Sequence, residues 1–289
     1  MTAFASAAPA LGVLPPLSNH SFERIARFLR REAGIELPPD KHTLVQSRLR
    51  KHVVAGGYGD YDSYVDETLS RRGIALITLI DALTTNKTAF FREADHFRYL
   101  QEQWLPTLSQ LAGSQRPLRV WSAGCSAGQE PYTLALVLLD ALELYPQLRF
   151  EILATDLSTA MLKIAVNGIY SVDDVAPVPE SMRHRYLMRS RKAGDNRVAM
   201  GPELREHVRF QRFNLVTDAY AFEAPFDLVF CRNVMIYFSN STREAVVRRI
   251  HDVMVPGALL MIGHSESLSG FKTPLRYVEP TIYTRPLEN

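Results

Sequence analysis

The chain has 289 residues, of which 46% are hydrophobic and 22% charged, and its formal net charge is +2. This composition is typical of a globular protein, and the length allows one large domain or two ordinary ones. Stretches of roughly 18 apolar residues, which a membrane span needs, are not found. Two cysteines are too few for a disulfide framework, and the small net charge does not by itself indicate nucleic acid. We therefore expect a cytoplasmic protein without direct membrane insertion.

The first part of the chain is predicted to be a tail followed by a helical module. Residues 1–17 are rich in Ala and Pro and lack the basic start of a signal peptide, so we predict a disordered tail. Residues 18–85 show helical periodicity and no convincing strand. Ser21 can cap the first helix, and further helices are expected over 40–54, 61–69 and 74–83.

From residue 118 onward, short apolar strands alternate with amphipathic helices. Such alternation indicates a mainly parallel sheet with helices on both faces. Helices are expected over 132–144, 159–166 and 242–253. Strands are expected over 118–122, 150–155, 208–213, 226–231, 258–263 and around 277–283. Residues 167–205 are polar and too many for an ordinary connection, so we predict an inserted subdomain there.

The turn after the first expected strand is the clearest candidate for a ligand site. Gly124 and Gly128 let the backbone approach a ligand closely, and Pro131 suits the first turn of a helix. A nucleotide-like ligand can lie over the strand end near the positive pole of that helix. Asp156 ends the second strand, where a ribose-binding carboxylate is expected in a nucleotide-binding fold. The alternative is that Asp156 only caps the following helix.

The same turn contains Gly-x-Ser-x-Gly, the pattern of a serine-hydrolase nucleophile elbow. Ser126, Asp227 and His264 occur in the order of a hydrolase triad. However, a hydrolase elbow normally follows several strands, whereas the residues before 118 have a helical pattern. Asp227 also begins a strand instead of following one. A serine hydrolase using Ser126 is therefore kept only as a minor alternative.

Polar residues also follow the third and fourth expected strands. Asn214 and Leu215 come after the third strand, and Arg232 and Asn233 come after the fourth. In a doubly wound sheet these loops meet at the carboxyl edge, beside Asp156. Asparagine side chains donate and accept hydrogen bonds, and the arginine adds a fixed positive charge. The sequence thus predicts one composite ligand site at this edge.

Taken together, the motifs resemble the chemotaxis-receptor protein-glutamate methyltransferases, the CheR family, over essentially all of residues 18–289. The matching segments are Leu83–Glu93 (LTTNKTAFFRE), Val120–Gly124, Glu130–Tyr132, Ala154–Asp156, Asn214–Leu215, Cys231–Phe238 (CRNVMIYF) and Gly263–Glu266 (GHSE). The resemblance implies an α/β, class I S-adenosylmethionine-dependent methyltransferase with a Rossmann-like doubly wound sheet. Its catalytic domain would cover 86–289, with a small all-helical N-terminal domain over 18–85 and a small β-subdomain inserted at about 167–205.

The resemblance also implies site residues, of which Arg92 and Tyr237 are the catalytic candidates. Arg92 is the first choice to hold the incoming carboxylate, and Tyr237 would lie near the transferred methyl group. Asp156 and Glu130 would serve the ribose and methionyl ends of the cofactor, in either order. S-adenosylmethionine would become S-adenosylhomocysteine, with no metal. Cofactor contacts map to Asn86, Thr88, Arg92, Gly124, Glu130, Asp156, Asn214, Leu215, Arg232 and Asn233.

The implied partner is the cytoplasmic domain of bacterial chemoreceptors, whose glutamates would be methylated for sensory adaptation. The family's N-terminal module presents basic residues to an acidic receptor bundle, and some members bind a receptor C-terminal peptide at the insertion by strand addition. Here the loop 190–196 holds a single glycine where tethering members are glycine-rich, which argues against tethering and favours a tether-independent enzyme at least as well. The candidate substrate-binding residues are Lys41, Arg48, Lys51, His52, Arg189 and Arg197.

Two other functions remain as alternatives. Basic patches would suit a methyltransferase of the same fold that acts on RNA, but no aromatic residues interleave the stripe over 41–52 for base stacking. The second alternative is a regulator that binds the cofactor without catalysis, but the full set of motifs argues against it. We expect no nucleic-acid partner.

Overall fold

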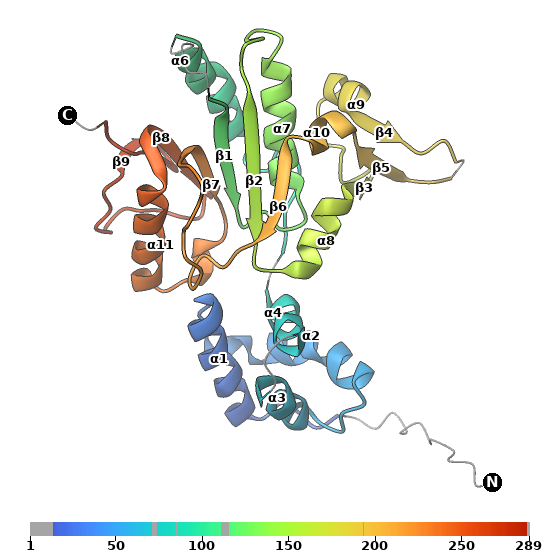
Figure 1. The fold of residues 1–289 in the computed structure, drawn as a ribbon. Helices are drawn as coiled ribbons and strands as arrows, with labels where there is room; N and C mark the ends of the chain where they lie inside the picture. The colour runs from blue at the N-terminus through green and yellow to red at the C-terminus, as the bar shows by residue number, and fades with distance from the viewer. Residues whose placement is uncertain (1–13, 71–73, 85, 111–115, 193, 288–289) are drawn as a thin grey trace. The chain divides into compact units, whose positions relative to one another are not determined.

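The computed structural model describes residues 14–70, 74–84, 86–110, 116–192 and 194–287. The chain divides into two compact units, residues 1–84 and 85–289 (Figure 1). Most of the predicted tail, residues 1–13, lies outside the described residues. The end of that segment is packed, because Leu17 is buried and its N–H donates to Gln46 Oε1 at 2.9 Å.

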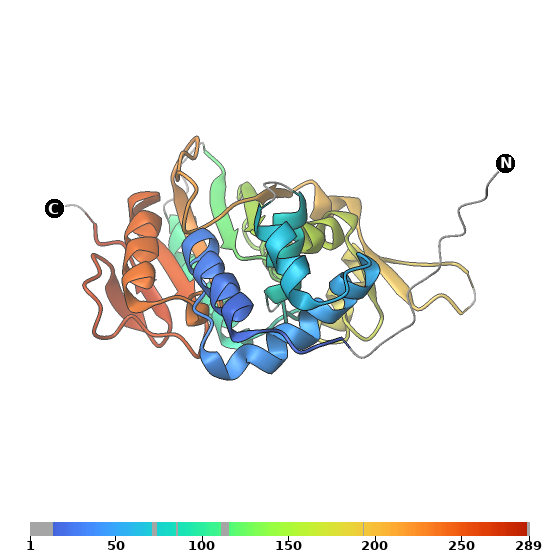
Figure 2. The ribbon, with the colours of Figure 1, turned by 90° about the horizontal axis from the view of Figure 1, so that it is seen from below.

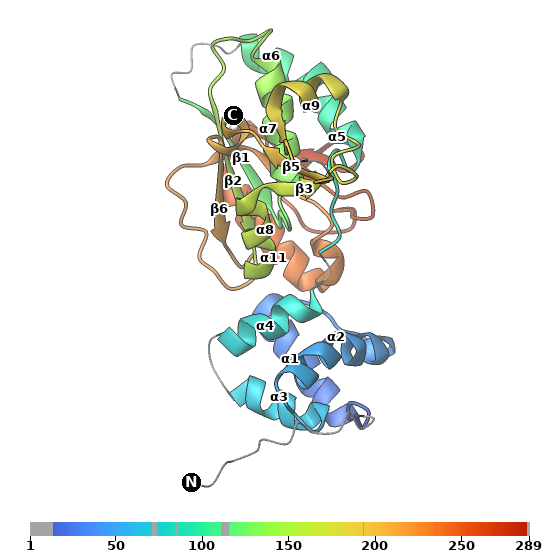
Figure 3. The same ribbon diagram turned by 90° about the vertical axis from the view of Figure 1, so that its right-hand side faces the viewer.

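The N-terminal unit is helical, as its periodicity predicts. Its elements are α1 (Asn19–Ala33), the 3₁₀ turn η1 (Pro39–Lys41), α2 (His42–Ala55), α3 (Tyr61–Ser70) and α4 (Ile74–Leu83). Helix α2 contacts α3 and α4, and α1 contacts α3, so the four pack as one bundle (Figures 2 and 3). The expected cap is wrong: Ser18 caps α1, and its Oγ accepts from the Ser21 N–H at 3.1 Å. Ser21 instead lies buried in the first turn.

The larger unit is built on a seven-stranded sheet with the order β6-β2-β1-β7-β8-β10-β9. The strands are β1 (Leu118–Ala123), β2 (Phe150–Asp156), β6 (Val208–Arg212), β7 (Phe226–Cys231), β8 (Met254–Ile262), β9 (Arg276–Glu279) and β10 (Ile282–Thr284). Strands β6, β2, β1, β7 and β8 are parallel, and β10 and β9 add an antiparallel edge.

Alternate residues of the strands enter two separate cores, so both faces of the sheet are covered. Val120 packs in one core with α7, and Trp121 packs in the other with α11. This explains why the central strands β1, β7 and β8 are mainly apolar instead of alternating strictly with polar residues. The helices and turns of this unit are α5 (Ala94–Tyr99), the π-helical segment η2 (Leu100–Trp104), α6 (Leu105–Gln110), α7 (Gln129–Ala141), α8 (Thr159–Asn167), the 3₁₀ turn η3 (Met235–Tyr237) and α11 (Asn240–Asp252).

The predicted insertion forms a small antiparallel sheet with the order β3-β5-β4. It contains β3 (Ile169–Ser171), α9 (Glu180–Tyr186), β4 (Leu187–Arg189), β5 (Arg197–Met200) and α10 (Pro202–Arg205). The joined ends of β4 and β5 project from the rest of the larger unit (Figures 1 and 2). Its inner residues, such as Tyr170 and Met182, share the core of α7, so the insertion is packed against the sheet's helical layer.

Several predicted boundaries are corrected by the structure. Helix α7 begins at Gln129, ahead of the expected start, because Gly128 takes a left-handed φ of 95° and ends the turn there. The final stretch 277–283 is a hairpin of β9 and β10 instead of one strand. Cys125 and Cys231 are both buried, and neither forms a disulfide. Among the described residues, no helix combines the length and apolarity that crossing a membrane requires.

Candidate active site

The candidate site lies where the strand order of the large sheet reverses. From β1 the chain moves outward through β2 and β6 on one side, and through β7 and β8 on the other. Open parallel sheets bind their ligands at the carboxyl edge of such a reversal, because adjacent loops diverge there. The loops after β1, β2 and β7 therefore meet at this point, as the sequence predicts.

The turn after β1 depends on glycine. Gly124 has a φ of 85°, and a Cβ added there would lie 2.3 Å from Val234 Cγ2, in the loop after β7. Gly128 has a φ of 95°, and a Cβ there would meet Ala165 Cβ at 2.9 Å. Side chains at either position would force these neighbours apart. The glycines thus permit close packing of the loops as well as close approach of a ligand.

Asp156 connects the first two loops. Its Oδ2 accepts the Ser126 N–H at 2.7 Å, and its Oδ1 accepts the Ser158 N–H at 2.8 Å. The cap of α8 is Ser158, whose Oγ accepts the Met161 N–H at 3.2 Å. Asp156 is therefore not the helix cap that the alternative interpretation required. It orients the turn after β1 at the strand end.

Glu130 and Arg232 form a buried ion pair between α7 and the loop after β7. Glu130 Oε2 lies 3.1 Å from Arg232 Nε, and Ser122 Oγ donates to Glu130 Oε1 at 2.7 Å. Burial raises the pKa of Glu130, although the Arg232 charge acts in the opposite direction. The Arg232 guanidinium lies over the rings of Phe97 and Phe230, at 5.5 and 5.4 Å from their centroids. Its side chain is only 2% exposed, so this cation is enclosed by protein.

The same guanidinium holds the segment that contains Arg92. Arg232 Nη2 donates to the Arg92 carbonyl at 2.6 Å, and Arg232 Nη1 lies 3.1 Å from His96 Nδ1. Asn233 Nδ2 donates to Glu93 Oε1 at 3.2 Å. Burial opposes ionisation of Glu93, but Arg232 and the Asn233 hydrogen bond hold its pKa below the ordinary value. Glu93 is therefore an ionised partner of the buried arginine.

Backbone strain is concentrated around this network. Among the described residues, the non-glycine positions with positive φ are Phe91, Glu93, Ser126, Asn233 and Thr281. Each of them lies in one of the loops just described, or makes a hydrogen bond to one of their residues. Strained positions persist where the surroundings fix them, and they are common at functional sites.

A second buried carboxylate shapes the loop after β7. Glu266 accepts N–H groups from Gly263 at 2.6 Å, Asn233 at 2.9 Å and Ile236 at 3.1 Å. Burial raises the pKa of Glu266, against the effect of these hydrogen bonds. The loop that it holds leads into η3, which ends at the half-buried Tyr237. Glu266 is part of the GHSE motif, but the sequence does not indicate that its carboxylate holds this loop in place.

The remaining predicted cofactor residues lie around the same loops. The Asn86 carbonyl accepts from Ser126 Oγ at 3.1 Å, and Thr88 is half-buried in the same segment. Asn214 is buried, and its Oδ1 accepts the Val216 N–H at 2.9 Å, which closes the turn after β6. Leu215 beside it is buried. The Asn214 side chain thus bonds to the backbone of its own turn.

The hydrolase triad does not assemble. Asp227 lies at the start of β7, where its Oδ2 accepts from Arg116 Nη1 at 2.7 Å and from the Arg119 N–H at 2.9 Å. Ser126 follows the end of β1, at the opposite edge of the sheet. A serine nucleophile would need its acidic partner near the same edge. The minor alternative of a serine hydrolase therefore lacks its geometry.

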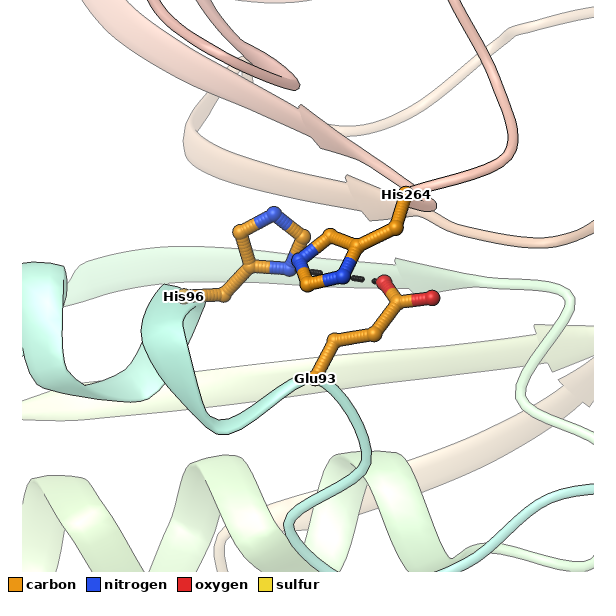
Figure 4. Close-up of side chains that lie close together, drawn as sticks. All are labelled: Glu93, His96 and His264. Atoms are coloured by element: carbon orange, nitrogen blue, oxygen red, sulfur yellow. Dashed lines mark ion pairs between the residues drawn. The ribbon is translucent and has the colours of Figure 1, made fainter.

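Glu93, His96 and His264 point toward one another, as Figure 4 shows, with ligand-type atoms all within 4.8 Å. His96 Nδ1 lies 3.8 Å from Glu93 Oε2, and the two histidine rings meet edge to face at 5.2 Å. A metal ion here would lie against the Arg232 guanidinium, which already contacts His96 Nδ1. Like charges at such separations repel strongly in a buried site. The cluster suits a hydrogen-bond network better than a cation.

The predicted substrate-binding residues differ in exposure. Lys41 and Lys51 are exposed, and Arg50, which the sequence interpretation passed over, is exposed between them in sequence. Arg48 Nη1 donates to the Leu83 carbonyl at 2.6 Å, so this side chain also stabilises the end of α4. Burial, then the Lys51 charge, lowers the pKa of the half-buried His52.

In the insertion, Arg189 and Arg197 are both exposed. Arg197 forms a bidentate pair with Asp195, at 2.8 and 2.9 Å. Its charge is thus already balanced within its own hairpin, whereas no such bidentate partner is found for Arg189 among the described residues.

Comparisons with known proteins agree with this architecture. Residues 86–284 match the family model described as CheR methyltransferase, SAM binding domain, and residues 20–84 match the CheR methyltransferase, all-alpha domain. The chain is 37% identical to a chemotaxis protein methyltransferase of Salmonella typhimurium, over 92% of this chain and 90% of that protein. It is 38% identical to chemotaxis protein methyltransferase 1 of Pseudomonas aeruginosa, over 91% and 95%. A chemotaxis protein methyltransferase of Borreliella burgdorferi is 35% identical, over 93% and 95%.

Proposed function

The chain belongs to the CheR methyltransferase family, and we propose that it methylates glutamate side chains of chemoreceptors to give glutamyl methyl esters. The predicted enzyme class and cofactor are confirmed by the family, which is that of S-adenosylmethionine-dependent methyltransferases. The roles of individual residues and the mode of receptor binding belong to the proposal.

The residues at the strand reversal fit S-adenosylmethionine. A carboxylate whose two oxygens each accept a backbone N–H, as in Asp156, is held rigidly and can still accept from the two ribose hydroxyls. Glu130 lies at the opening of α7, beside the glycine turn, where it would serve the methionyl end. Because Gly124 and Gly128 have no Cβ atoms, the backbone of the turn can approach the bound cofactor closely.

The reaction requires positioning more than acid–base catalysis. S-adenosylmethionine supplies an electrophilic methyl group, and a glutamate carboxylate, ionised at neutral pH, is itself the nucleophile. The carboxylate oxygen forms the new bond to the methyl carbon as the bond to sulfur breaks, so no proton is transferred. Correct orientation of two reactants can contribute on the order of 7–11 kcal/mol at the limit. The protein therefore needs a group that holds the incoming carboxylate.

We assign that role to Arg92. Its main-chain carbonyl is fixed at 2.6 Å by the buried Arg232, which anchors the residue, while its own side chain is only half-buried. One guanidinium N–H donates to the Lys87 carbonyl at 2.9 Å. A guanidinium has five N–H donors in a fork that matches a carboxylate. This combination of an anchored backbone and an accessible fork is the observation that carries the assignment. Tyr237, at the end of η3, would line the methyl-transfer path.

The test is transfer of labelled methyl groups from S-adenosylmethionine to receptor-containing membranes. Base-labile release of methanol identifies an ester, whereas an alkali-stable product or labelled RNA would exclude the proposed chemistry. Arg92→Ala should lower kcat by about 100-fold or more, since a hydrogen-bonded charge pair contributes on the order of 3 kcal/mol. Arg98→Ala is the matched control, because Arg98 is exposed and pairs with Asp95 on α5. Near-normal transfer by a folded Arg92→Ala protein would refute the role of Arg92.

Receptor binding is proposed to use the exposed basic residues of α2 and its approach, Lys41 and Lys51, by electrostatic steering. The Arg48 contact with the end of α4 makes it a weaker candidate than the sequence implied. For the insertion, calorimetry with receptor C-terminal peptides tests tethering. Binding that is lost in Arg189→Glu would support it, and the absence of heat with every peptide would favour the tether-independent enzyme.

A further inference from the structure

His96 lies at the centre of the network that anchors Arg92, although no motif singled it out. Its side chain is buried, and its two ring nitrogens have different partners. Nδ1 lies 3.1 Å from Arg232 Nη1, and Nε2 lies 2.7 Å from Thr281 Oγ1 in the turn between β9 and β10. One ring thus connects the C-terminal hairpin to the arginine that holds the Arg92 carbonyl.

The hydrogen bonds fix the tautomer of this ring. The Thr281 hydroxyl has a single proton, which it donates to the Pro280 carbonyl at 2.5 Å. Its oxygen must therefore accept from His96, so Nε2 carries the ring proton. Arginine can only donate, and Nδ1 must then be the unprotonated acceptor. A second proton on the ring would place an N–H against the guanidinium.

The charged surroundings agree with a neutral ring. Arg232 in the loop after β7 and His264 after β8 face His96 and disfavour a positive charge, while Glu93 and Asp95 at the start of α5 act in the opposite direction. Burial is the largest effect, and together these groups lower the pKa of His96 to about 4. At neutral pH the ring is therefore an uncharged acceptor for Arg232.

We propose that His96 is a positioning residue for methyl transfer, which holds Arg232 in the orientation that fixes both the Arg92 carbonyl and Glu130. Arg232 reaches these two groups with Nη2 and Nε, at 2.6 and 3.1 Å. Without an acceptor at the remaining Nη1, the guanidinium can rotate away from one of them. His96 would not touch the substrate, and it acts through Arg92, so the inference rests on the role proposed for that residue.

The wild-type protein provides a first test that requires no variant. Long-range ¹H–¹⁵N spectra of the full chain should show His96 as the Nε2–H tautomer, with no titration between about pH 7.5 and about pH 5. The ring borders a cavity of about 490 Å³, which the exposed His264 also lines. An Nδ1–H tautomer for His96, or titration near its ordinary pKa, would overturn the proposal.

Two near-isosteric variants separate the two hydrogen bonds. His96→Asn places a carbonyl oxygen where Nδ1 lies and can still accept from Arg232, whereas His96→Gln places an amide N–H near Nε2 and keeps only the Thr281 bond. We expect kcat to fall by about 10- to 100-fold in His96→Gln, since hydrogen bonds to charged groups contribute about 1.5–3 kcal/mol. We expect His96→Asn to remain within about threefold of the wild type, with KM for S-adenosylmethionine little changed in both.

Equal losses in the two variants, or normal turnover by His96→Gln, would overturn the role of His96. The cavity beside the ring leaves room for either side chain without overpacking. If neither variant folds, the tautomer measurement on the wild type still decides. Failure of the proposed function is distinguishable, because then the wild-type protein itself would form no base-labile ester, whatever the state of His96.

Discussion

The depressed pKa of His96 makes a quantitative prediction about stability. The pKa is lowered from 6.5 to about 4, so the unfolded chain binds a proton between these values that the folded protein does not. Stability then rises with pH in this range. The contribution of the neutral ring is fully present above about pH 6.5 and is lost as the pH falls toward about 4. Because each pKa unit corresponds to about 1.4 kcal/mol, the loss is about 3 kcal/mol.

The perturbation is acidification, and the control is His96→Asn, in which this group no longer titrates. Glu93, whose pKa is lowered, also contributes stability that is present above its ordinary pKa and is lost as the pH falls through the folded value. This second effect is common to both proteins and cancels in their difference. The wild type should therefore lose about 3 kcal/mol more than His96→Asn between about pH 7.5 and about pH 4.

The assay is urea unfolding followed by tryptophan fluorescence. The sequence contains two tryptophans, Trp104 and Trp121, and both lie in the unit of residues 85–289. The signal therefore reports that unit alone, which removes the ambiguity of a chain with two compact units. Parallel pH profiles for the two proteins would refute the depressed pKa of His96, and with it the argument that the ring is a neutral acceptor.

Three further perturbations test the site. Gly124→Ala adds backbone strain and places a Cβ 2.3 Å from Val234 Cγ2. It should destabilise the protein by about 1–3 kcal/mol and weaken S-adenosylhomocysteine binding in calorimetry. Gly194→Ala is the control, because Gly194 also has a positive φ, of 79°, but has open space around it, and this variant should leave binding unchanged. Glu266→Gln replaces one of the two carboxylate oxygens that accept the three backbone N–H groups. It should lower the free energy of unfolding by about 1–3 kcal/mol and reduce kcat. Unchanged turnover would contradict the proposed role of Glu266 in holding the loop. Raising salt from about 50 to about 200 mM should increase the apparent KM for receptor but not for S-adenosylmethionine, and Lys51→Glu should reproduce this effect at low salt; a salt-independent KM would exclude steering.

The fold could be predicted where a local pattern determines the structure. Strand β7 has the predicted bounds because Phe226–Cys231 is apolar except for Asp227 and is buried on both faces. The start of α7 was misplaced, since the left-handed φ of Gly128 sets it and Pro131 only indicates the first turn. The hairpin of β9 and β10 was predicted as one strand, because its turn at Thr281, which has a φ of 66°, contains no glycine. Boundaries that depend on unusual dihedrals are thus the ones that the sequence conceals.

The site was predicted in part for a similar reason. Residues next to strand ends were located because a parallel sheet brings those ends together. His96 and Thr281 were missed, since they are 185 residues apart and meet only through tertiary structure. Arg232 was predicted to contact the cofactor from its position after the fourth strand and from the family resemblance, neither of which indicates that its side chain is buried. Its burial follows from a complementary set of carboxylates, carbonyls and aromatic rings that come from separate elements, which no single segment reveals.

The two arginines of the site therefore have different environments and would do different work. Arg232 is enclosed, and the carboxylates of Glu93 and Glu130, at 3.8 and 3.1 Å, compensate its charge. Its electrostatic attraction for a further anion is therefore weak. Arg92 is half-buried, close enough to Glu130 for its charge to lower the pKa of that residue, and its side chain has an accessible fork. A single arginine could not satisfy both demands, because a cation that is rigidly held by buried carboxylates cannot also bind an incoming one. The enclosed cation keeps the loops in place, and we propose that the accessible one recognises the substrate.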